Sequence, residues 1–148
     1  MKKLLGLLFL MLILVSATEF SITKTDTMHS IEGTWELQSF YNYDGVAITD
    51  TVLPQTNYRQ VKIYNGGKIM WSRYSPQDTI GRFGYGSYKL NDNQLIETIE
   101  YGDYQMMRAL DTMRVFSFEL MLSSDTFSQI SSDEEGNRTF SENYVRVN

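Results

Sequence analysis

Few side chains in this sequence are suited to acid–base or nucleophilic chemistry at neutral pH, and His29 is its single histidine. The chain contains no cysteine, which excludes a thiolate nucleophile, a thiolate metal site and any disulfide. A Ser-His-Asp hydrolase would need His29 as its base, oriented by a buried acid. No serine and aspartate stand at a recognisable spacing from it, so we expect an exposed His29 and no catalytic residue.

The metal-binding side chains are equally sparse. With one histidine and no cysteine, only carboxylates remain, and these suit Ca²⁺ or Mg²⁺. The densest acidic stretch, Asp133-Glu134-Glu135-Gly136-Asn137, lacks the alternating ligand spacing of a calcium loop. We interpret it as a solvated hairpin tip and predict neither a metal site nor a cofactor.

Three charged residues stand among apolar neighbours in segments that alternate like strands. Arg73 falls on the same face as Trp71, and Arg82 and Glu97 occupy similar positions in the next two segments. A buried charge is costly unless it is paired, so inward faces would make these residues an ion pair or the polar anchor of a ligand. A slip of one residue at a glycine bulge would turn them toward water instead. The sequence leaves both directions open.

Aromatic residues near these charges would suit a pocket for a ligand with a flat or acyl body and one polar end. Aromatic side chains are also ordinary filling of a β-barrel, and this alternative stays open. The candidate ligand-binding residues are Trp71, Arg73, Arg82, Tyr85, Tyr88, Glu97 and Tyr101.

The elements that position these residues are short β-like runs separated by turns, at the spacing of a barrel or sandwich. Asn65-Gly66-Gly67 is a strong hairpin signal because glycine and asparagine accept positive φ. Residues 42–55 form a longer connection, and Tyr104–Asp111 fits either a helical turn or a loop. Val61 and Ile63 mark the apolar face of the second run. The eight predicted runs are Gly33–Tyr41, Tyr58–Tyr64, Lys68–Tyr74, Thr79–Leu90, Gln94–Tyr101, Arg114–Leu122, Thr126–Ile130 and Arg138–Val147.

Eight strands joined mostly by short turns favour an all-β protein, an eight-stranded antiparallel up-and-down barrel. Closing the sheet removes its exposed edges. Such a barrel encloses a space just large enough for side chains or one small ligand. A two-sheet sandwich is the alternative, because turn spacing does not separate the two architectures.

The N-terminus has the features of a secretory signal peptide. Lys2 and Lys3 precede the apolar run Leu4–Val15, and Ser16 and Ala17 supply small residues for cleavage. The run is shorter than the about 20 residues that span a bilayer, although an uncleaved anchor is the alternative. We predict a signal peptide at 1–17, a polar arm at 18–30 and one domain at 31–148. The mature protein would be periplasmic or secreted, without a stable membrane anchor.

The predicted mature chain is acidic. Loss of Lys2 and Lys3 leaves 11 of the 13 basic residues against 18 acidic ones, a formal net charge of −7. Nucleic acids and anionic membrane surfaces both need a positive patch. We therefore predict no nucleic-acid partner.

The segment Glu32-Gly33-Thr34-Trp35-Glu36-Leu37 resembles the Gly-x-Trp signature of the lipocalins. The resemblance implies that Trp35 plugs the closed end of the barrel under a basic side chain of the last strand. Arg146 is the expected residue, with Arg138 as the alternative. The order of segments from Ile31 to Val147 is also similar to a group of exported bacterial lipocalin-like domains of uncharacterised function. Gly84–Tyr88 and Glu97–Tyr101 are in the style of that group, which implies a binding habit without naming a ligand.

Three hypotheses for function follow. The first is an exported binding protein that holds a small, partly apolar or amphipathic molecule in the barrel. The second is a filled barrel whose surface binds a protein or the cell envelope. The third, an isomerase or hydrolase on the same scaffold, ranks last because the sequence offers no catalytic dyad. The sequence does not indicate an oligomeric state.

Overall fold

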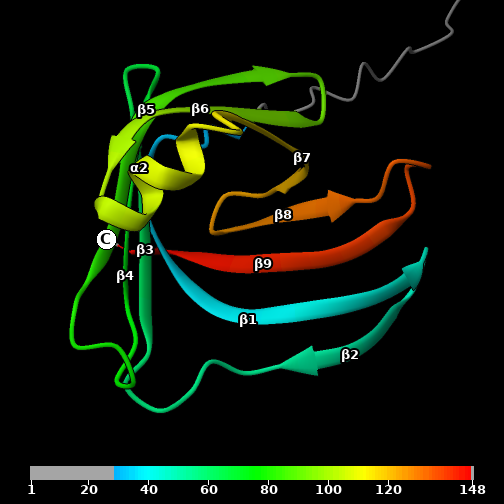
Figure 1. Ribbon diagram of the computed structural model, residues 1–148. Coiled ribbons are helices and arrows are strands. Elements are labelled where there is room, and N and C mark those ends of the chain that lie inside the picture. The colour runs from blue at the N-terminus through cyan, green and yellow to red at the C-terminus, as the bar shows by residue number, and fades with distance from the viewer. Residues whose placement is uncertain (1–28, 148) are drawn as a thin grey trace, which may run out of the picture.

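A computed structural model describes residues 29–147 of the chain, and in this part nine antiparallel strands form one continuous sheet (Figure 1). One short helix, α2, interrupts the succession of strands. The elements are β1 (Gly33–Gly45), β2 (Ile48–Val52), β3 (Arg59–Asn65), β4 (Lys68–Tyr74), β5 (Arg82–Asn91), β6 (Gln94–Gly102), α2 (Tyr104–Leu110), β7 (Val115–Leu122), β8 (Thr126–Ser132) and β9 (Arg138–Val147).

The sheet closes on itself because β1 pairs with β9 along most of its length, from Thr34 opposite Val147 to Gly45 opposite Arg138. β1 also pairs with β3 near its start, so β1 and β3 to β9 form a ring of eight strands. The all-β, eight-stranded antiparallel barrel is thereby confirmed, and the sandwich is excluded.

The ninth strand, β2, was not expected, because the sequence predicts a connection over residues 42–55. β1 extends past Tyr41 to Gly45, and the chain then turns back. The Asp44 carboxylate accepts hydrogen bonds from the backbone N–H groups of Val46 and Ala47, while Gly45 has a φ of +109°. All five residues of β2 are exposed, and the strand pairs only with β1. A strand that buries no side chain carries no core pattern that the sequence could reveal.

The predicted hairpin between the second and third runs is confirmed. Gly66 and Gly67 have φ values of +56° and +76° at the two central positions, and Asn65 pairs with Lys68. The β4 bounds are those predicted, Lys68–Tyr74.

A register shift in the β5–β6 pair decides which side chains enter the barrel. Tyr85 pairs with Tyr101, but Gly86 pairs with Ile99, so one residue of β6 bulges. A side chain at Gly86 would overlap the Thr98 carbonyl, which requires glycine at this close approach. The bulge leaves Ile99 inside and turns Tyr101 outward.

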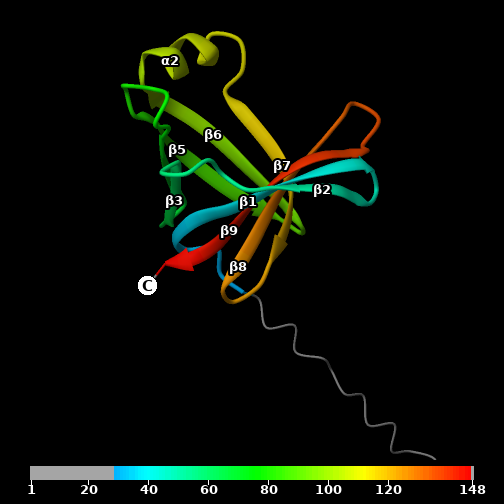
Figure 2. The same cartoon turned by 90° about the horizontal axis from the view of Figure 1, so that it is seen from below.

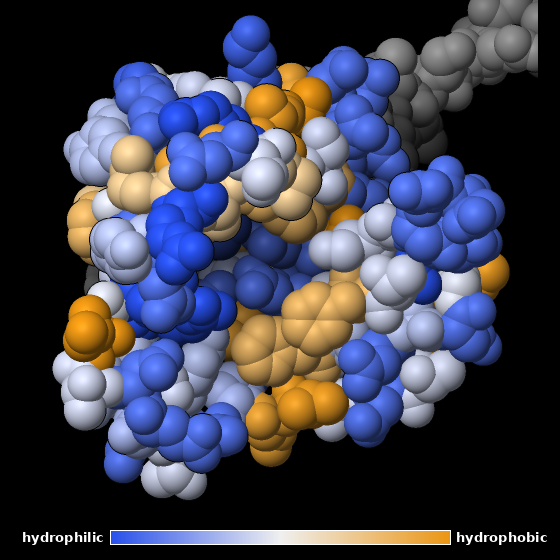
Figure 3. Space-filling view, viewed as in Figure 1, coloured by the Kyte–Doolittle hydropathy of each residue, from blue (hydrophilic) through white to orange (hydrophobic). Residues whose placement is uncertain are grey.

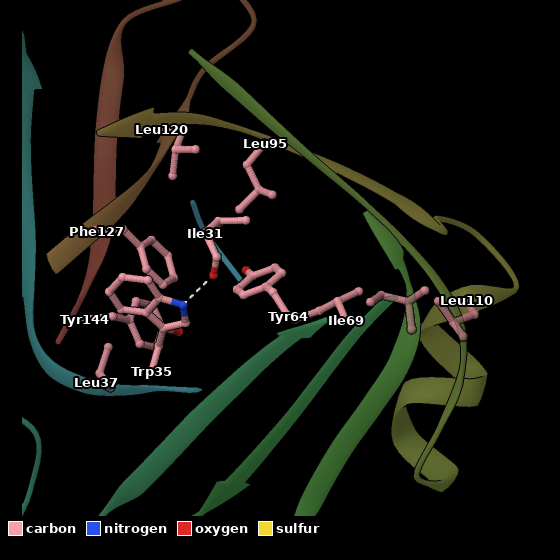
Figure 4. Close-up of a cluster of buried hydrophobic side chains, with 11 residues drawn as sticks. Ile31, Trp35, Leu37, Tyr64, Ile69, Leu95, Leu110, Leu120, Phe127 and Tyr144 are labelled. Atoms are coloured by element: carbon pink, nitrogen blue, oxygen red, sulfur yellow. Dashed lines mark hydrogen bonds between the residues drawn. The ribbon is translucent and has the colours of Figure 1, made fainter. Parts of the chain in front are cut away.

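The apolar core is centred on Trp35 and extends past Ile69 to Leu110 of α2 (Figure 4). Trp35 is completely buried, meets Phe127 edge to face at 4.9 Å, and donates its indole N–H to the Ile31 carbonyl at 2.7 Å. Phe127 also stacks on Tyr144. The Arg146 guanidinium lies over the Trp35 ring, 4.1 Å from its centroid, in the arrangement that the sequence resemblance implied. The alternative residue, Arg138, pairs with Glu119 instead.

The segment Tyr104–Asp111, for which the sequence allowed either a helical turn or a loop, contains the helix α2. Asp103 caps it by accepting hydrogen bonds from the N–H groups of Gln105 and Met106. β6 pairs with β7 only over its first half, from Gln94 to Thr98, and α2 follows the unpaired half. Figure 2 shows α2 beyond the ends of β5 and β6.

The predicted signal peptide at 1–17 and nearly all of the predicted arm at 18–30 lie outside the described residues, so export stays a prediction. His29 is exposed, as expected. Within residues 29–147, no helix has the length and apolar character needed to cross a membrane.

Candidate ligand cavity

A cavity of about 200 Å³ opens into the barrel from one side. Figure 3 shows it as a hollow with hydrophilic side chains at its floor, between β3 to β5 on one side and β1, β8 and β9 on the other. Its lining residues are Gln60, Lys62, Trp71, Arg73, Glu97, Ile99, Met106, Phe116, Phe118, Gln129 and Glu142.

A buried ion pair between Lys62 of β3 and Glu97 of β6 forms one part of the floor. The two residues are 4% and 3% exposed, and the ammonium lies 2.8 and 3.1 Å from the two carboxylate oxygens. Lys62 also donates to the Gln129 amide oxygen at 2.6 Å, and the Tyr64 hydroxyl donates to Glu97. All three ammonium donors are therefore engaged, which a buried lysine requires.

The second part of the floor is centred on one oxygen of Glu142. This oxygen accepts hydrogen bonds from Gln60 at 3.1 Å, from Gln129 at 2.8 Å and from the Tyr144 hydroxyl at 2.6 Å. Gln129 bonds both Lys62 and Glu142, and so joins the two parts into one network. Among the described residues, no buried side-chain nitrogen or oxygen lacks a partner. The floor is a pre-formed polar surface rather than a set of unsatisfied groups.

Apolar side chains form the walls. Phe116 and Phe118 come from β7, Ile99 from β6, and Met106 from α2. Trp71 of β4 lies against Gly84 of the neighbouring strand, where an added Cβ would be 2.5 Å from the indole nitrogen. Glycine at this position leaves the space that the indole occupies.

Of the predicted ligand-binding residues, the structure brings Trp71, Arg73 and Glu97 to the cavity. Tyr88 points inward but packs edge-on against Tyr64, 5.0 Å between ring centroids, within the core rather than on the cavity lining. Ligand binding by any of them stays a prediction.

Three predicted residues lie elsewhere. Arg82 is at the rim, where it pairs with Asp103 at 3.0 Å. Tyr85 and Tyr101 lie on the outer face and pack on each other at 5.1 Å, because the bulge in β6 turns Tyr101 out of the barrel and Tyr85 follows the outward parity of β5. The ion pair that the sequence left open, between Glu97 and Arg73 or Arg82, does not form, because Lys62 pairs with Glu97.

Sequence reasoning missed the polar half of the floor. Val61 and Ile63 mark the outward face of β3, and Gln60, Lys62 and Tyr64 point inward. Alternation separates the two faces of a strand but does not say which is buried when the interior is polar. One signal was present in the sequence. Lys62 and Tyr64 lie two residues apart on one face of β3, and Glu97 stands among apolar residues in β6.

Two tyrosines of this network titrate abnormally. Burial raises the pKa of Tyr64 well above its ordinary value, and the neighbouring Glu97 carboxylate raises it further. Burial, with the charge of Glu142, has the same effect on the pKa of Tyr144. Both hydroxyls remain protonated donors at neutral pH.

We expect the barrel to lose stability in alkali above about pH 10. Below the unfolded pKa of tyrosine, the contribution of Tyr64 and Tyr144 is complete. As the pH rises toward the higher pKa values of the folded state, these tyrosines lose their protons in the unfolded chain first. Each residue therefore lowers the free energy of unfolding by up to about 1.4 kcal/mol per pH unit. Urea unfolding at several pH values, with near-ultraviolet tyrosinate absorbance, measures this. Ionisation of all tyrosines before unfolding would contradict it.

Comparison with solved structures places the fold. A lipocalin-like protein from Bacteroides uniformis superposes with a TM-score of 0.57 at 12% identity, covering 78% of this chain and 97% of the other. An uncharacterised protein from Bacteroides eggerthii superposes with a TM-score of 0.54 at 12% identity, covering 80% of this chain and 100% of the other. No protein-family model and no curated protein sequence matches. With the closed antiparallel sheet described above, this likeness shows that the chain has a lipocalin-like fold.

Proposed function

We propose that this protein binds a small, partly apolar molecule in the cavity of its barrel. The observation that carries the proposal is the cavity itself, in which apolar walls stand above a polar floor whose hydrogen bonds are already made. Binding sites for small molecules combine concave apolar surface with a few placed polar groups.

The composition of the interior supports binding over a purely structural barrel. A barrel of eight strands is small enough for side chains to fill it. This one keeps an open volume beside a buried Lys62–Glu97 pair, and hydrophobic residues of similar volume in place of such a pair are often neutral or stabilising. Stability alone therefore does not favour a polar, partly open interior over an apolar, filled one. Ligand binding accounts for such an interior.

The volume limits the ligand. The cavity of about 200 Å³ is smaller than the roughly 300–1,000 Å³ of sites for drug-sized molecules. We infer a ligand the size of one aromatic ring with a short side chain.

The tryptophans provide a direct readout of binding. Trp35 is inaccessible in the core, whereas Trp71 lines the cavity. Titration with 2-phenylethanol and 3-phenylpropionate is expected to change the fluorescence of Trp71 saturably, and Trp71→Phe should abolish the change while Trp35 still emits.

A cavity-filling variant tests the location. Ile99→Phe places a larger side chain in the cavity wall and is expected to weaken probe binding at least tenfold, about 1.4 kcal/mol. Ile63→Phe makes the same change on the outer face of the barrel and is the matched control. Equal binding by both variants, or no saturable response from any probe, would contradict the proposal.

A further inference from the structure

Two arginines face each other at the mouth of the barrel. Arg73 of β4 and Arg82 of β5 are direct partners in the strand register, and both share the inward parity of Trp71 and Gly84. Like charges directly opposite one another in a sheet are destabilising. A compensating anion is therefore expected near each of them.

The protein supplies that anion to only one of the two. Arg82 pairs with the Asp103 carboxylate at 3.0 Å and also donates to Gln105. Within residues 29–147, no carboxylate lies within 4.0 Å of the Arg73 guanidinium. Arg73 lies close enough to the Tyr58 hydroxyl to affect it: burial raises the pKa of Tyr58, and the nearby Arg73 charge lowers it in part. Arg73 is thus a half-buried cation on the cavity lining with no ionic partner among residues 29–147.

We propose that Arg73 binds the carboxylate of a small aromatic acid whose ring occupies the cavity; this rests on the proposed function. The planar guanidinium presents two parallel N–H donors that match a carboxylate. Trp71, Phe116 and Phe118 offer aromatic surface for a ring below it.

The charges of the cavity select a monoanion. Lys62 is engaged by Glu97 and Gln129, so among the described residues of the lining Arg73 is the cation left for a ligand. Glu142 places a carboxyl group on the same lining, and its charge would repel a dianion more strongly than a monoanion. A carboxylate fits this balance better than a phosphate dianion. The volume of about 200 Å³ excludes a long acyl chain.

The test compares 3-phenylpropionate with 3-phenylpropionamide, which has nearly the same shape and no charge. Trp71 fluorescence is expected to show at least tenfold tighter binding of the acid than of the amide. Added salt should weaken binding of the acid more than binding of the amide, because it screens the charge of Arg73.

Variants assign the effect to Arg73. Arg73→Gln is expected to weaken acid binding at least tenfold and to leave amide binding within about twofold. It should keep its Tm, because it removes a charge opposite Arg82. Arg73→Lys retains the charge without the planar guanidinium, and its affinity for the acid should lie between those of the wild type and Arg73→Gln. Arg59→Gln is the matched control, since Arg59 is an exposed rim residue paired with Glu36.

The outcomes separate this inference from the proposed function. Equal binding of acid and amide, or an Arg73→Gln variant that binds the acid unchanged, would overturn the role of Arg73 while leaving the cavity a binding site. Tighter binding of palmitate than of 3-phenylpropionate would contradict the inference that the ligand is small. Absence of any saturable response to either probe would overturn both.

Discussion

Replacement of Trp35 by alanine is expected to lower the free energy of unfolding by about 3–5 kcal/mol, the range for a large buried aromatic side chain. Trp35 has no exposed surface and contacts Phe127 in the centre of the core. The variant also removes the donor to the Ile31 carbonyl, leaving an acceptor without its partner. Urea unfolding with an unchanged m-value measures the loss. A loss below about 1 kcal/mol would contradict the central role of this side chain.

Arg146→Ala is expected to cost less than Trp35→Ala, and the two losses should not add. The guanidinium lies 4.1 Å from the indole centroid and donates to the carbonyls of Glu32, Ser30 and Ser124 at 2.6, 2.8 and 2.8 Å. It holds the entering chain and the β7–β8 turn against the tryptophan. A double-mutant cycle should give a coupling of about 0.5–2 kcal/mol.

Arg138→Ala provides the control for this cycle. Arg138 is in the same strand but pairs with Glu119 away from the core, so its loss should add to that of Trp35→Ala. Additive losses for Arg146 and Trp35 would refute the stacking.

Gly33 explains why the signature begins with glycine. Its φ is +133°, and a side chain there would overlap the Arg146 guanidinium. The glycine of the signature therefore meets a backbone requirement, a positive φ, where the arginine crosses the chain two residues before the tryptophan that it covers.

The fold was largely predictable because its strands bury apolar side chains on one face and are separated by turn residues. β4 and β9 have the predicted bounds, and the Gly66–Gly67 turn joins β3 and β4 as expected. β2 was missed because it is exposed throughout. Its existence depends on pairing with β1 rather than on burial, and pairing leaves no pattern in a single strand.

The candidate site was predictable only in part. The parity of β4 correctly grouped Trp71 with Arg73, but a single bulge in β6 separated Tyr101 from Glu97 and Ile99. The partner of Glu97 lies 35 residues away along the chain and crosses the barrel to reach it. Strand parity gives the faces of each strand, whereas contacts across the interior depend on the closure and tilt of the whole sheet.

Removal of the Glu97 charge is expected to have an effect as large as the loss of Trp35. Glu97→Leu leaves the Lys62 ammonium buried with Gln129 as its remaining partner, and breaking a buried pair in this way costs about 3–5 kcal/mol. Chemical denaturation measures it. Lys68→Ala, which breaks the exposed pair with Glu100, is the control and should change stability by no more than about 1 kcal/mol.

The double variant Lys62→Met with Glu97→Leu distinguishes the two roles that the sequence left open for this glutamate. It removes both charges, and well-packed apolar residues in place of a buried pair often restore or exceed the original stability. If it recovers stability and still binds 3-phenylpropionate, the pair is a structural element beneath the ligand and Arg73 is the polar anchor. If it recovers stability but loses binding of both acid and amide, the ion pair itself contacts the ligand. A double variant no more stable than Glu97→Leu would contradict the view that the uncompensated lysine causes the loss.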